Sequence, residues 1–333
     1  MSLFDRRRLL RAGVGAGALA GLAALTRSAF AQEAPWPSRP LRLIVVYPPG
    51  GVSDLMARSL AEPLAQALRV PVLVEHRPGA GGAVGIDALA RSPADGYTLC
   101  FSAISPLTLQ PLVTRLAQDR LQAALPVASV MRTPLLVVGT PAFEGRRFED
   151  LVSTARERPG QLRWASSGVA TTGHLVLAQV RALAGVDITH IPYQGGGPQL
   201  NDALGGQFEI LSTNVAAQQL RYIEAGRLRA LAVGAPRRLE ALPRVPTLAE
   251  LGFAPANRDS LFGVFAPVGT PAAVTARLNA EINRLLRTPM LRARLSESHN
   301  LAAGGSTADF AREIAQDRQR NEALVASDPR AFD

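Results

Sequence analysis

The sequence predicts an α/β protein with two lobes, and three observations lead to this fold class. Strand-type apolar runs alternate with helical patterns over residues 41–102. The same alternation restarts at Leu162 and continues to Val233, and the helical patterns after residue 271 have no strands of their own. Alternating strands and helices form parallel sheets with right-handed crossovers, so each block predicts a sheet. The 333 residues are enough for two domains of ordinary size.

The first block opens with the strand Leu41–Val46, which ends at the turn Pro48–Gly51. Ser53 and Asp54 then occupy the N-cap region of a helix whose leucines recur at helical spacing. Pro63 should kink or split this helix, because proline lacks the amide N–H. The block continues with the strand Val70–Glu75, the glycine-rich loop Arg77–Gly82, the helix Ala83–Ala90 and the strand Tyr97–Ser102.

The second block follows a fourth strand, Leu135–Val138, and a helix, Phe148–Glu157. Its predicted strands are Leu162–Ala165, Ile188–Ile191, Phe208–Ser212 and Leu228–Val233, and its helices are Thr171–Ala184, Leu200–Leu204 and Gln218–Ala225. One more strand, Leu261–Ala266, precedes the helices Ala272–Arg287 and Thr307–Leu324. Because these last helices bring no sheet of their own, we expect them to fold back onto the first lobe.

Composition excludes several classes of protein. Apolar residues make up 47% and charged residues 19% of the chain, which favours a packed core over disorder. The formal net charge is +9, and all 36 basic residues are arginines. They are scattered and not interleaved with aromatic residues, so nucleic acid is not the expected partner. The lone cysteine, Cys100, lies in an apolar run and is expected to be a small buried residue.

Residues 1–31 are predicted to be a cleaved export signal. Arg6, Arg7 and Arg8 are followed by two leucines, by an apolar stretch to Leu25 and by a small-residue cleavage site ending at Ala31. The paired arginines indicate the twin-arginine route. The apolar stretch is shorter than the roughly 20 residues that a transmembrane helix needs. The expected location is therefore the periplasm.

Three glycine-rich turns follow strands and open helices, at Pro49–Asp54, Gly79–Gly85 and Ser166–Thr172. A fourth glycine-rich segment is Tyr193–Gly197. Strand-to-helix turns of open α/β sheets are where ligands bind, and helix N-termini attract anions. Together the four segments predict a site for a small anion.

Other site chemistry is not supported. The loop Gly79–Gly85 has valine, Val84, where a dinucleotide fingerprint needs its third glycine. The four histidines show no metal-ligand spacing, so no cofactor and no metal are expected. Ser166 and His174 could reach one cleft as a hydrolase pair, but the sequence offers no specific acid to complete a triad. Enzymatic activity is therefore not expected.

The chain resembles the substrate-binding proteins of tripartite tricarboxylate transporters, the TctC or Bug receptors. The matching stretches lie in family order along nearly the whole chain after the leader: Pro48–Asp54, Val74–Gly82, Ala94–Leu99, Trp164–Gly168 with His174, Pro192–Gly195, Ala225–Val233, Val245–Glu250 and Ala266–Pro271. Leu261 stands where tryptophan is common in the family, Gln194 where lysine is common, and Ser212–Asn214 lacks a frequent aspartate. The missing aspartate argues against a ligand with an ammonium group.

The resemblance implies a type II periplasmic binding-protein fold, with two lobes joined by crossing strands near Leu135–Val138 and Leu261–Ala266. The implied boundaries are residues 38–135 and 261–333 for the first lobe and 136–260 for the second. A small carboxylate would bind in the cleft, and membrane transporter subunits would receive it from a monomeric receptor. A sensor that presents the carboxylate to a membrane signalling partner is the alternative. The expected ligand-binding residues are Tyr47, Gly50, Gly51, Ser53, Asp54, Gly81, Gly82, Ser105, Ser166, Ser167, Thr171, His174, Tyr193, Gly195 and Asn214.

Overall fold

The computed structural model describes residues 36–114, 124–328 and 331–332. The predicted leader, residues 1–31, lies outside the described residues. Residues from Arg39 onward form one compact unit, which contains the sheet and the site. Within the described residues, no helix is both long and apolar enough to cross a membrane.

A single mixed sheet runs through this unit in two halves joined by one long strand, β4 (Ala124–Gly139). The first sheet half contains β1 (Leu41–Val45), β2 (Val72–His76), β3 (Thr98–Ala103), β9 (Asp259–Pro267) and β10 (Leu301–Ala302). The second sheet half contains β5 (Arg163–Ser166), β6 (Thr189–Pro192), β7 (Ile210–Asn214) and β8 (Arg229–Gly234). The strand order is β2-β1-β3-β9-β4-β7-β5-β6, with β8 and β10 also paired to β4.

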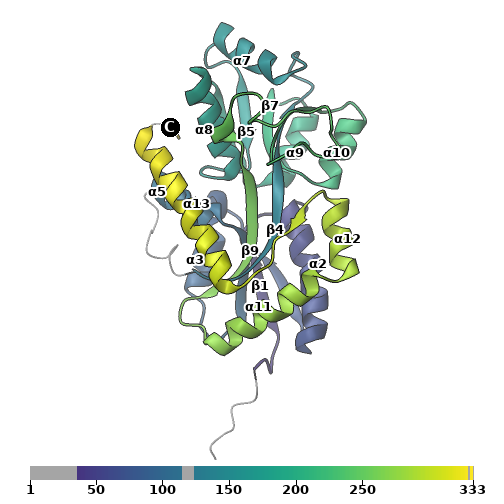
Figure 1. Cartoon of the computed structure of the whole chain (residues 1–333), viewed down its shortest axis with the longest axis vertical. Coiled ribbons are helices and arrows are strands. Elements are labelled where there is room, and N and C mark those ends of the chain that lie inside the picture. The colour runs from purple at the N-terminus through teal and green to yellow at the C-terminus, as the bar shows by residue number, and fades with distance from the viewer. Residues whose placement is uncertain (1–35, 115–123, 329–330, 333) are drawn as a thin grey trace, which may run out of the picture. The chain divides into compact units, whose positions relative to one another are not determined.

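The strand β4 changes partners part-way along its length. Its residues up to Pro134 pair with β9, and those from Leu135 to Gly139 pair with β7 and β8. Two register shifts interrupt the β4–β9 ladder, one of them directly after Pro126. Prolines and bulges bend a strand because they interrupt the ladder of hydrogen bonds. Figure 1 shows β4 and β9 side by side through the middle of the molecule.

Parallel pairing within each block confirms the predicted βαβ units. The strand β1 pairs in parallel with β2 and β3, and β5 pairs in parallel with β6 and β7. The connecting helices are α2 (Val52–Leu68), α3 (Ala83–Ala90), α8 (Thr172–Ala184), α9 (Gly196–Leu204) and α10 (Ala217–Glu224). The helix α7 (Phe148–Glu157) lies between β4 and β5 in the chain.

The C-terminal helices pack on elements of the first sheet half. The helix α13 (Thr307–Ser327) places Phe310 against Phe265 of β9, with ring centroids 5.2 Å apart. The helix α11 (Ala272–Leu286) packs against β4, and α12 (Pro289–Glu297) contacts α2. The sequence patterns had not predicted α12, β10 or the short helices α4 (Ser105–Thr108) and α5 (Gln110–Val113).

Two local predictions are corrected. The helix α2 continues through Pro63, so this proline does not split it, and a kink at Pro63 stays a prediction. The helix begins at Val52 with Gly51 as its N-cap, which places Ser53 and Asp54 in the first turn rather than at the cap.

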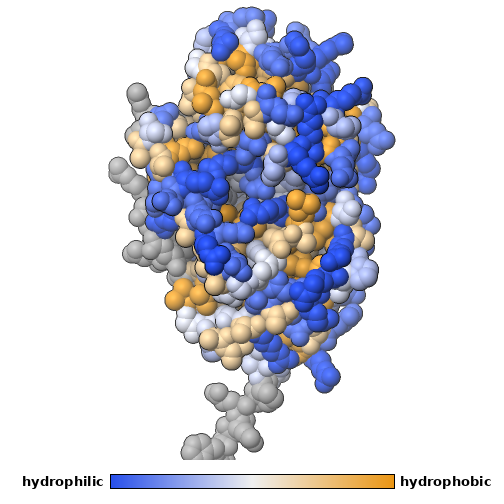
Figure 2. Space-filling model, in the orientation of Figure 1, coloured by the Kyte–Doolittle hydropathy of each residue, from blue (hydrophilic) through white to orange (hydrophobic). Residues whose placement is uncertain are grey.

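The cores of the two halves are separate apolar clusters. In the first half, Ile44, Cys100 and Phe265 pack together, so the prediction that Cys100 is buried is confirmed. In the second half, the fully buried Trp164 packs with Phe148 and Val176. Large apolar side chains that remain exposed are scattered over α2, β2, α3, α8, α12, β10 and the segment after β9, and Figure 2 shows small hydrophobic groups interspersed among hydrophilic residues on one face. No large apolar docking patch is therefore evident among the described residues on that face.

Candidate functional site

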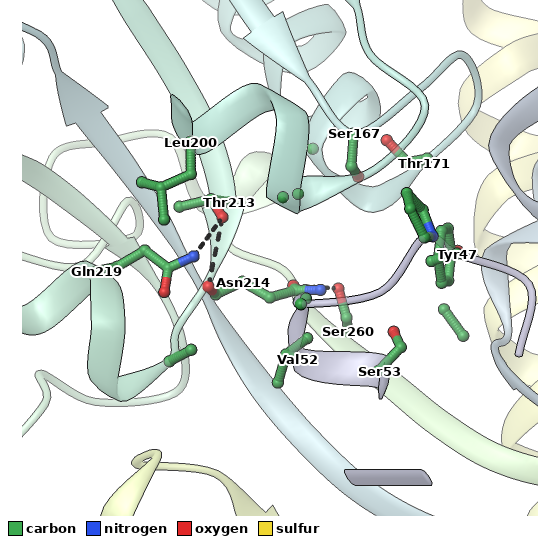
Figure 3. Close-up of a pocket in the computed structure, with 18 of the residues that line it drawn as sticks. Tyr47, Val52, Ser53, Ser167, Thr171, Leu200, Thr213, Asn214, Gln219 and Ser260 are labelled. Atoms are coloured by element: carbon green, nitrogen blue, oxygen red, sulfur yellow. Dashed lines mark hydrogen bonds between the residues drawn. The ribbon is translucent and has the colours of Figure 1, made fainter. Parts of the chain in front are cut away.

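A cavity of about 400 Å³ lies between the two sheet halves, at the ends of their strands. The first half contributes the β1–α2 turn and the segment after β3 that contains Ser105. The second half contributes the β5–α8 turn, the start of α9 and the segment from β7 into α10. Figure 3 shows side chains from both halves facing this space.

The β1–α2 turn is held in shape by Asp54. Its Oδ2 accepts a hydrogen bond of 3.0 Å from the Gly50 amide, and its Oδ1 lies 2.7 Å from Arg58 Nε and 2.8 Å from His76 Nε2. Burial by itself would raise the pKa of Asp54, but the hydrogen bonds from Gly50, His76 and Arg58 outweigh it and lower the pKa. The carboxylate is therefore an internal support of the turn, with its oxygens already paired.

Helices from both halves begin at the cavity. The lining includes the N-caps and first turns of four helices: residues 51–53 at the start of α2, 171–173 at the start of α8, 196–198 at the start of α9, and 216, 218 and 219 at the start of α10. Thr171 caps α8, because its hydroxyl accepts from the His174 amide at 3.5 Å while donating to the Gly168 carbonyl at 2.8 Å. The first amides of a helix have no partner within the helix and carry partial positive charge. The cavity is therefore lined by several groups that favour a negative charge.

No side chain that lines the cavity carries a formal charge, among the residues that the structure describes. Hydroxyl groups supply most of the side-chain polarity: Tyr47, Ser53, Ser105, Ser167, Thr171, Thr172, Ser212, Thr213 and Ser260. Burial raises the pKa of Tyr47, so its phenol stays protonated, and its hydroxyl donates to the Gly81 carbonyl at 3.5 Å. An anion in this cavity would meet neutral donors and helix N-termini, with no carboxylate beside it.

Eight of the fifteen expected ligand-binding residues line the cavity: Tyr47, Gly50, Gly51, Ser53, Ser105, Ser167, Thr171 and Asn214. The other seven do not line it: Asp54, Gly81, Gly82, Ser166, His174, Tyr193 and Gly195. Whether the eight contact a ligand stays a prediction. The surroundings of Asp54 are described above, and the other six fall into three groups: the glycines, Ser166 with His174, and Tyr193.

Glycines among the seven make close contacts between the sheet halves. A Cβ added to Gly81 would lie 2.4 Å from the carbonyl oxygen of Val169, and one added to Gly195 would lie 2.4 Å from Pro48 Cδ. Gly82 is also tightly packed, but against Pro106 and Val46 of its own half. Real Cβ atoms do not approach so closely, so only glycine fits here while the halves are in contact. Gly81 and Gly195 thus permit contact between the halves beside the cavity.

Ser166 and His174 do not form a nucleophile–base pair. Ser166 Oγ lies 2.7 Å from Nε2 of His190, and the ring of His190 stacks on that of His174 at 3.8 Å. His174 Nδ1 already accepts a hydrogen bond from the Ala170 amide at 3.1 Å. Burial, with the charges of His190 and Arg181, lowers the pKa of His174 to about 3. The cluster of Ser166, His174 and His190 lies beneath the β5–α8 turn. Its two histidines support the turn on the side that faces away from the cavity.

Tyr193 also faces away from the cavity. Its hydroxyl donates to Asp202 Oδ2 at 2.7 Å, and its ring lies against Phe208. Burial and the neighbouring Asp202 raise its pKa to about 12. The segment Tyr193–Gly197 therefore reaches the cavity only through its last two glycines.

Sequence reasoning missed several lining residues. These are Pro48, Pro49, Val52, Leu55, Ala103, Leu135, Thr172, Gly173, Gly196–Pro198, Leu200, Asn201, Ser212, Thr213, Ala216, Gln218, Gln219, Ser260 and Phe262. Gly196 and Gly197 lie in the segment Tyr193–Gly197, which the sequence had marked as part of the anion site, although the expected ligand-binding residues stopped at Gly195. For Gln219 and Ser260 the sequence carries no such signal, because their place depends on how α10 and β9 cross the cavity.

The comparisons with known proteins agree with this geometry. Residues 56–328 match the model of the tripartite tricarboxylate transporter family receptor, TctC. The chain belongs to this family. It is a solute-binding receptor of the TctC type, as the sequence resemblance had indicated.

Individual relatives cover most of the chain. Protein BugT of Bordetella pertussis is 38% identical over 76% of this chain and 78% of its own length. A protein encoded between tcbD and tcbE of a Pseudomonas species is 34% identical over 96% of this chain and 94% of its own. The R. palustris protein Rpa4515, solved with adipate, has a TM-score of 0.82 at 31% identity and covers 87% of this chain and 97% of its own. The solved periplasmic binding protein BugD, 25% identical with a TM-score of 0.81, covers 88% of this chain and 98% of its own and confirms the predicted periplasmic binding-protein fold.

Proposed function

We propose that this receptor is exported to the periplasm, binds one small carboxylate in the cavity and delivers it to the membrane subunits of a tripartite tricarboxylate-type transporter. The observation that carries the proposal is the cavity lining: several helix N-termini and many hydroxyls, with no acidic side chain among the described lining residues. Hydrogen bonds to a charged group contribute roughly 1.5–3 kcal/mol each. Three or four of them are enough for a Kd on the order of 1 μM.

The ligands of solved relatives support the same class of solute. Rpa4515 was solved with adipate, and MatC of Rhodopseudomonas palustris, 25% identical with a TM-score of 0.82, with malate. In this chain, we expect the β1–α2 turn, Ser105 and the β5–α8 turn to hold the carboxylate, through the eight predicted residues that line the cavity. Asp54, Gly81 and Gly195 would act indirectly, by shaping the turn and by allowing the halves to meet.

A melting-temperature screen with mono-, di- and tricarboxylates on the purified receptor tests this proposal, with calorimetry on any acid that raises the melting temperature. One acid or a narrow set should stabilise the protein at concentrations above its Kd, since a ligand that binds only the folded state raises stability. We expect a monomeric receptor that uses no cofactor and releases its ligand unchanged. Mass spectrometry of the acid after incubation should therefore show no conversion. Absence of binding by every acid would refute the proposal, and conversion of the acid would point to an enzyme instead.

A further inference from the structure

A second cavity, of about 420 Å³, lies between the helix α13 and the start of the strand β9. Figure 1 shows α13 beside β9 on its course towards α8. The walls of this cavity come from both halves: α13 and Arg132 of β4 lie on the first half, and Leu175 of α8 belongs to the second. The two cavities share Ser105 and Thr172 alone among the described lining residues, so they are neighbours with different surroundings.

The second cavity is lined by charged side chains, whereas the first has none among the residues that the structure describes. These side chains are Arg132, Arg258, Asp259, Glu313, Asp317 and Arg320. One group of three is centred on Arg132, which lies 3.4 Å from Asp259 and 2.7 Å from Glu313. One guanidinium between two carboxylates leaves one negative charge over.

The other group of three is centred on Asp317. This carboxylate lies 3.6 Å from Arg258 and 3.4 Å from Arg320, and it also accepts hydrogen bonds from Thr108 and Asn321. One carboxylate between two guanidinium groups leaves one positive charge over. Asp317 and Glu313 are four residues apart on α13, which places the two groups ~5–6 Å from each other.

The guanidinium of Arg258 has donors that are free and accessible. Its side chain is 18% exposed, and it makes no hydrogen bond to any residue that the structure describes, because Asp317 is 3.6 Å away. A guanidinium has five N–H donors in a fixed plane and stays protonated. Burial lowers the pKa of Arg258 and raises that of Asp259, since neighbouring charges do not fully replace the lost hydration. Both side chains can therefore take a further partner of opposite charge.

We propose that the second cavity binds a zwitterionic amino acid, whose carboxylate lies at the group of Arg258 and whose ammonium lies at the group of Asp259. Charges held one helical turn apart fit an amino group that is two or three carbons from the carboxylate. An α-amino acid fits less well, because its charged groups share one carbon. This site is additional to the carboxylate site and does not depend on it.

Calorimetric titration with compounds of one chain length tests the inference. The compound 4-aminobutyrate carries both charges, butyrate the negative one and butylamine the positive one. The first cavity is filled beforehand with the acid that stabilises the receptor most in the carboxylate screen; if no acid of the screen binds, the titrations are run without one. We expect 4-aminobutyrate to bind with a Kd below ~1 mM, and about tenfold more tightly than either analogue. Glycine should bind more weakly than 4-aminobutyrate.

Three variants assign the binding to this cavity. Arg258→Gln removes the free cation, and Asp259→Asn removes the carboxylate while keeping its shape; each should weaken 4-aminobutyrate about tenfold or more. Arg294→Gln, at an exposed arginine of α12 outside both cavities, is the matched control and should keep the wild-type affinity. Circular dichroism melts of the three variants establish that they fold.

The outcomes separate this site from the carboxylate site. Absence of binding by 4-aminobutyrate, or equal binding of butyrate and butylamine, would overturn the inference and leave the charged groups as internal supports of α13. Equal effects of Arg258→Gln and Arg294→Gln would overturn it too, and glycine binding as tightly as 4-aminobutyrate would overturn the spacing of the two charges. Carboxylate binding is scored by its own screen, so either site can fail while the other stands.

Discussion

Gly81→Ala should weaken ligand binding by blocking contact between the two sheet halves. The added Cβ would lie 2.4 Å from the carbonyl oxygen of Val169, whereas ordinary contacts begin at 3.4 Å. The two segments would have to separate by about 1 Å there. Overpacking of this kind costs about 1–3 kcal/mol. If the cost falls on the ligand-bound, closed arrangement, the Kd rises about 5- to 150-fold.

A second effect of the substitution must be separated from the first. Gly81 has φ +63°, in the left-handed region, where alanine costs about 1–2 kcal/mol of folding free energy in any surroundings. Gly185 provides the matched control, with φ +62° and no atom within 4 Å of the added Cβ. Gly185→Ala should therefore lose similar stability and no affinity for the ligand.

The assay is calorimetric titration of both variants with the best acid from the screen, together with their melting temperatures without ligand. Small-angle scattering with saturating acid should also show a larger radius of gyration for Gly81→Ala than for Gly185→Ala. Equal affinities for the two variants would refute the reasoning, because they would show that the Gly81–Val169 contact has no part in binding.

Three further predictions concern the supports of the cavity. Asp54→Ala should lower the free energy of unfolding by about 1–3 kcal/mol and weaken ligand binding, because the Gly50 amide loses its acceptor. The control is Arg58→Ala, which removes an exposed partner of Asp54 and should change the free energy of unfolding by less than about 1 kcal/mol in urea melts. Thr171→Val should lower the free energy of unfolding by about 1 kcal/mol through loss of the α8 cap, and it should also weaken acid binding. Thr171→Ser, which keeps the hydroxyl, should restore both stability and affinity. A valine variant with wild-type affinity would exclude the Thr171 hydroxyl from the binding site. His174 and His190, with pKa values lowered to about 3 and about 4, are neutral when folded and bind protons below pH 6.5 when unfolded, so each should contribute about 2 kcal/mol to a fall in stability between pH 7.5 and 5. His174→Asn should remove about half of this dependence in melts across that range, and a wild-type melting temperature equal at both pH values would contradict the assignment.

The lowered pKa of His174 follows from packing that sequence patterns do not contain. In the parallel ladder of β5 and β6, Trp164 is opposite His190 and Ser166 is opposite Pro192. Ser166 and His190 are therefore diagonal neighbours on one face of the sheet, close enough for a hydrogen bond. The sequence places Ser166 nearer to His174, but the register brings it to His190. Pairing across strands is set by register, and spacing along the chain does not reveal it.

The sequence by itself determined the types of the main elements, the parallel βαβ units, the glycine-rich corners and the burial of Cys100. These depend on local patterns: apolar periodicity, turn residues and helix starts act over a few neighbouring positions. It also predicted eight of the residues that line the cavity, because strand-to-helix turns of such sheets gather at one edge.

Only the tertiary structure decided what the remaining glycines and polar residues do. Gly81 and Gly195 have the same local signature as Gly50 and Gly51, yet they contact the opposite half instead of lining the cavity. Gln219 has no local signature at all, and its place in the lining is evident only once α10 is placed beside β7. The physical reason is that contacts between distant segments depend on how β4 and β9 hold the two halves, and no short stretch of sequence encodes that arrangement.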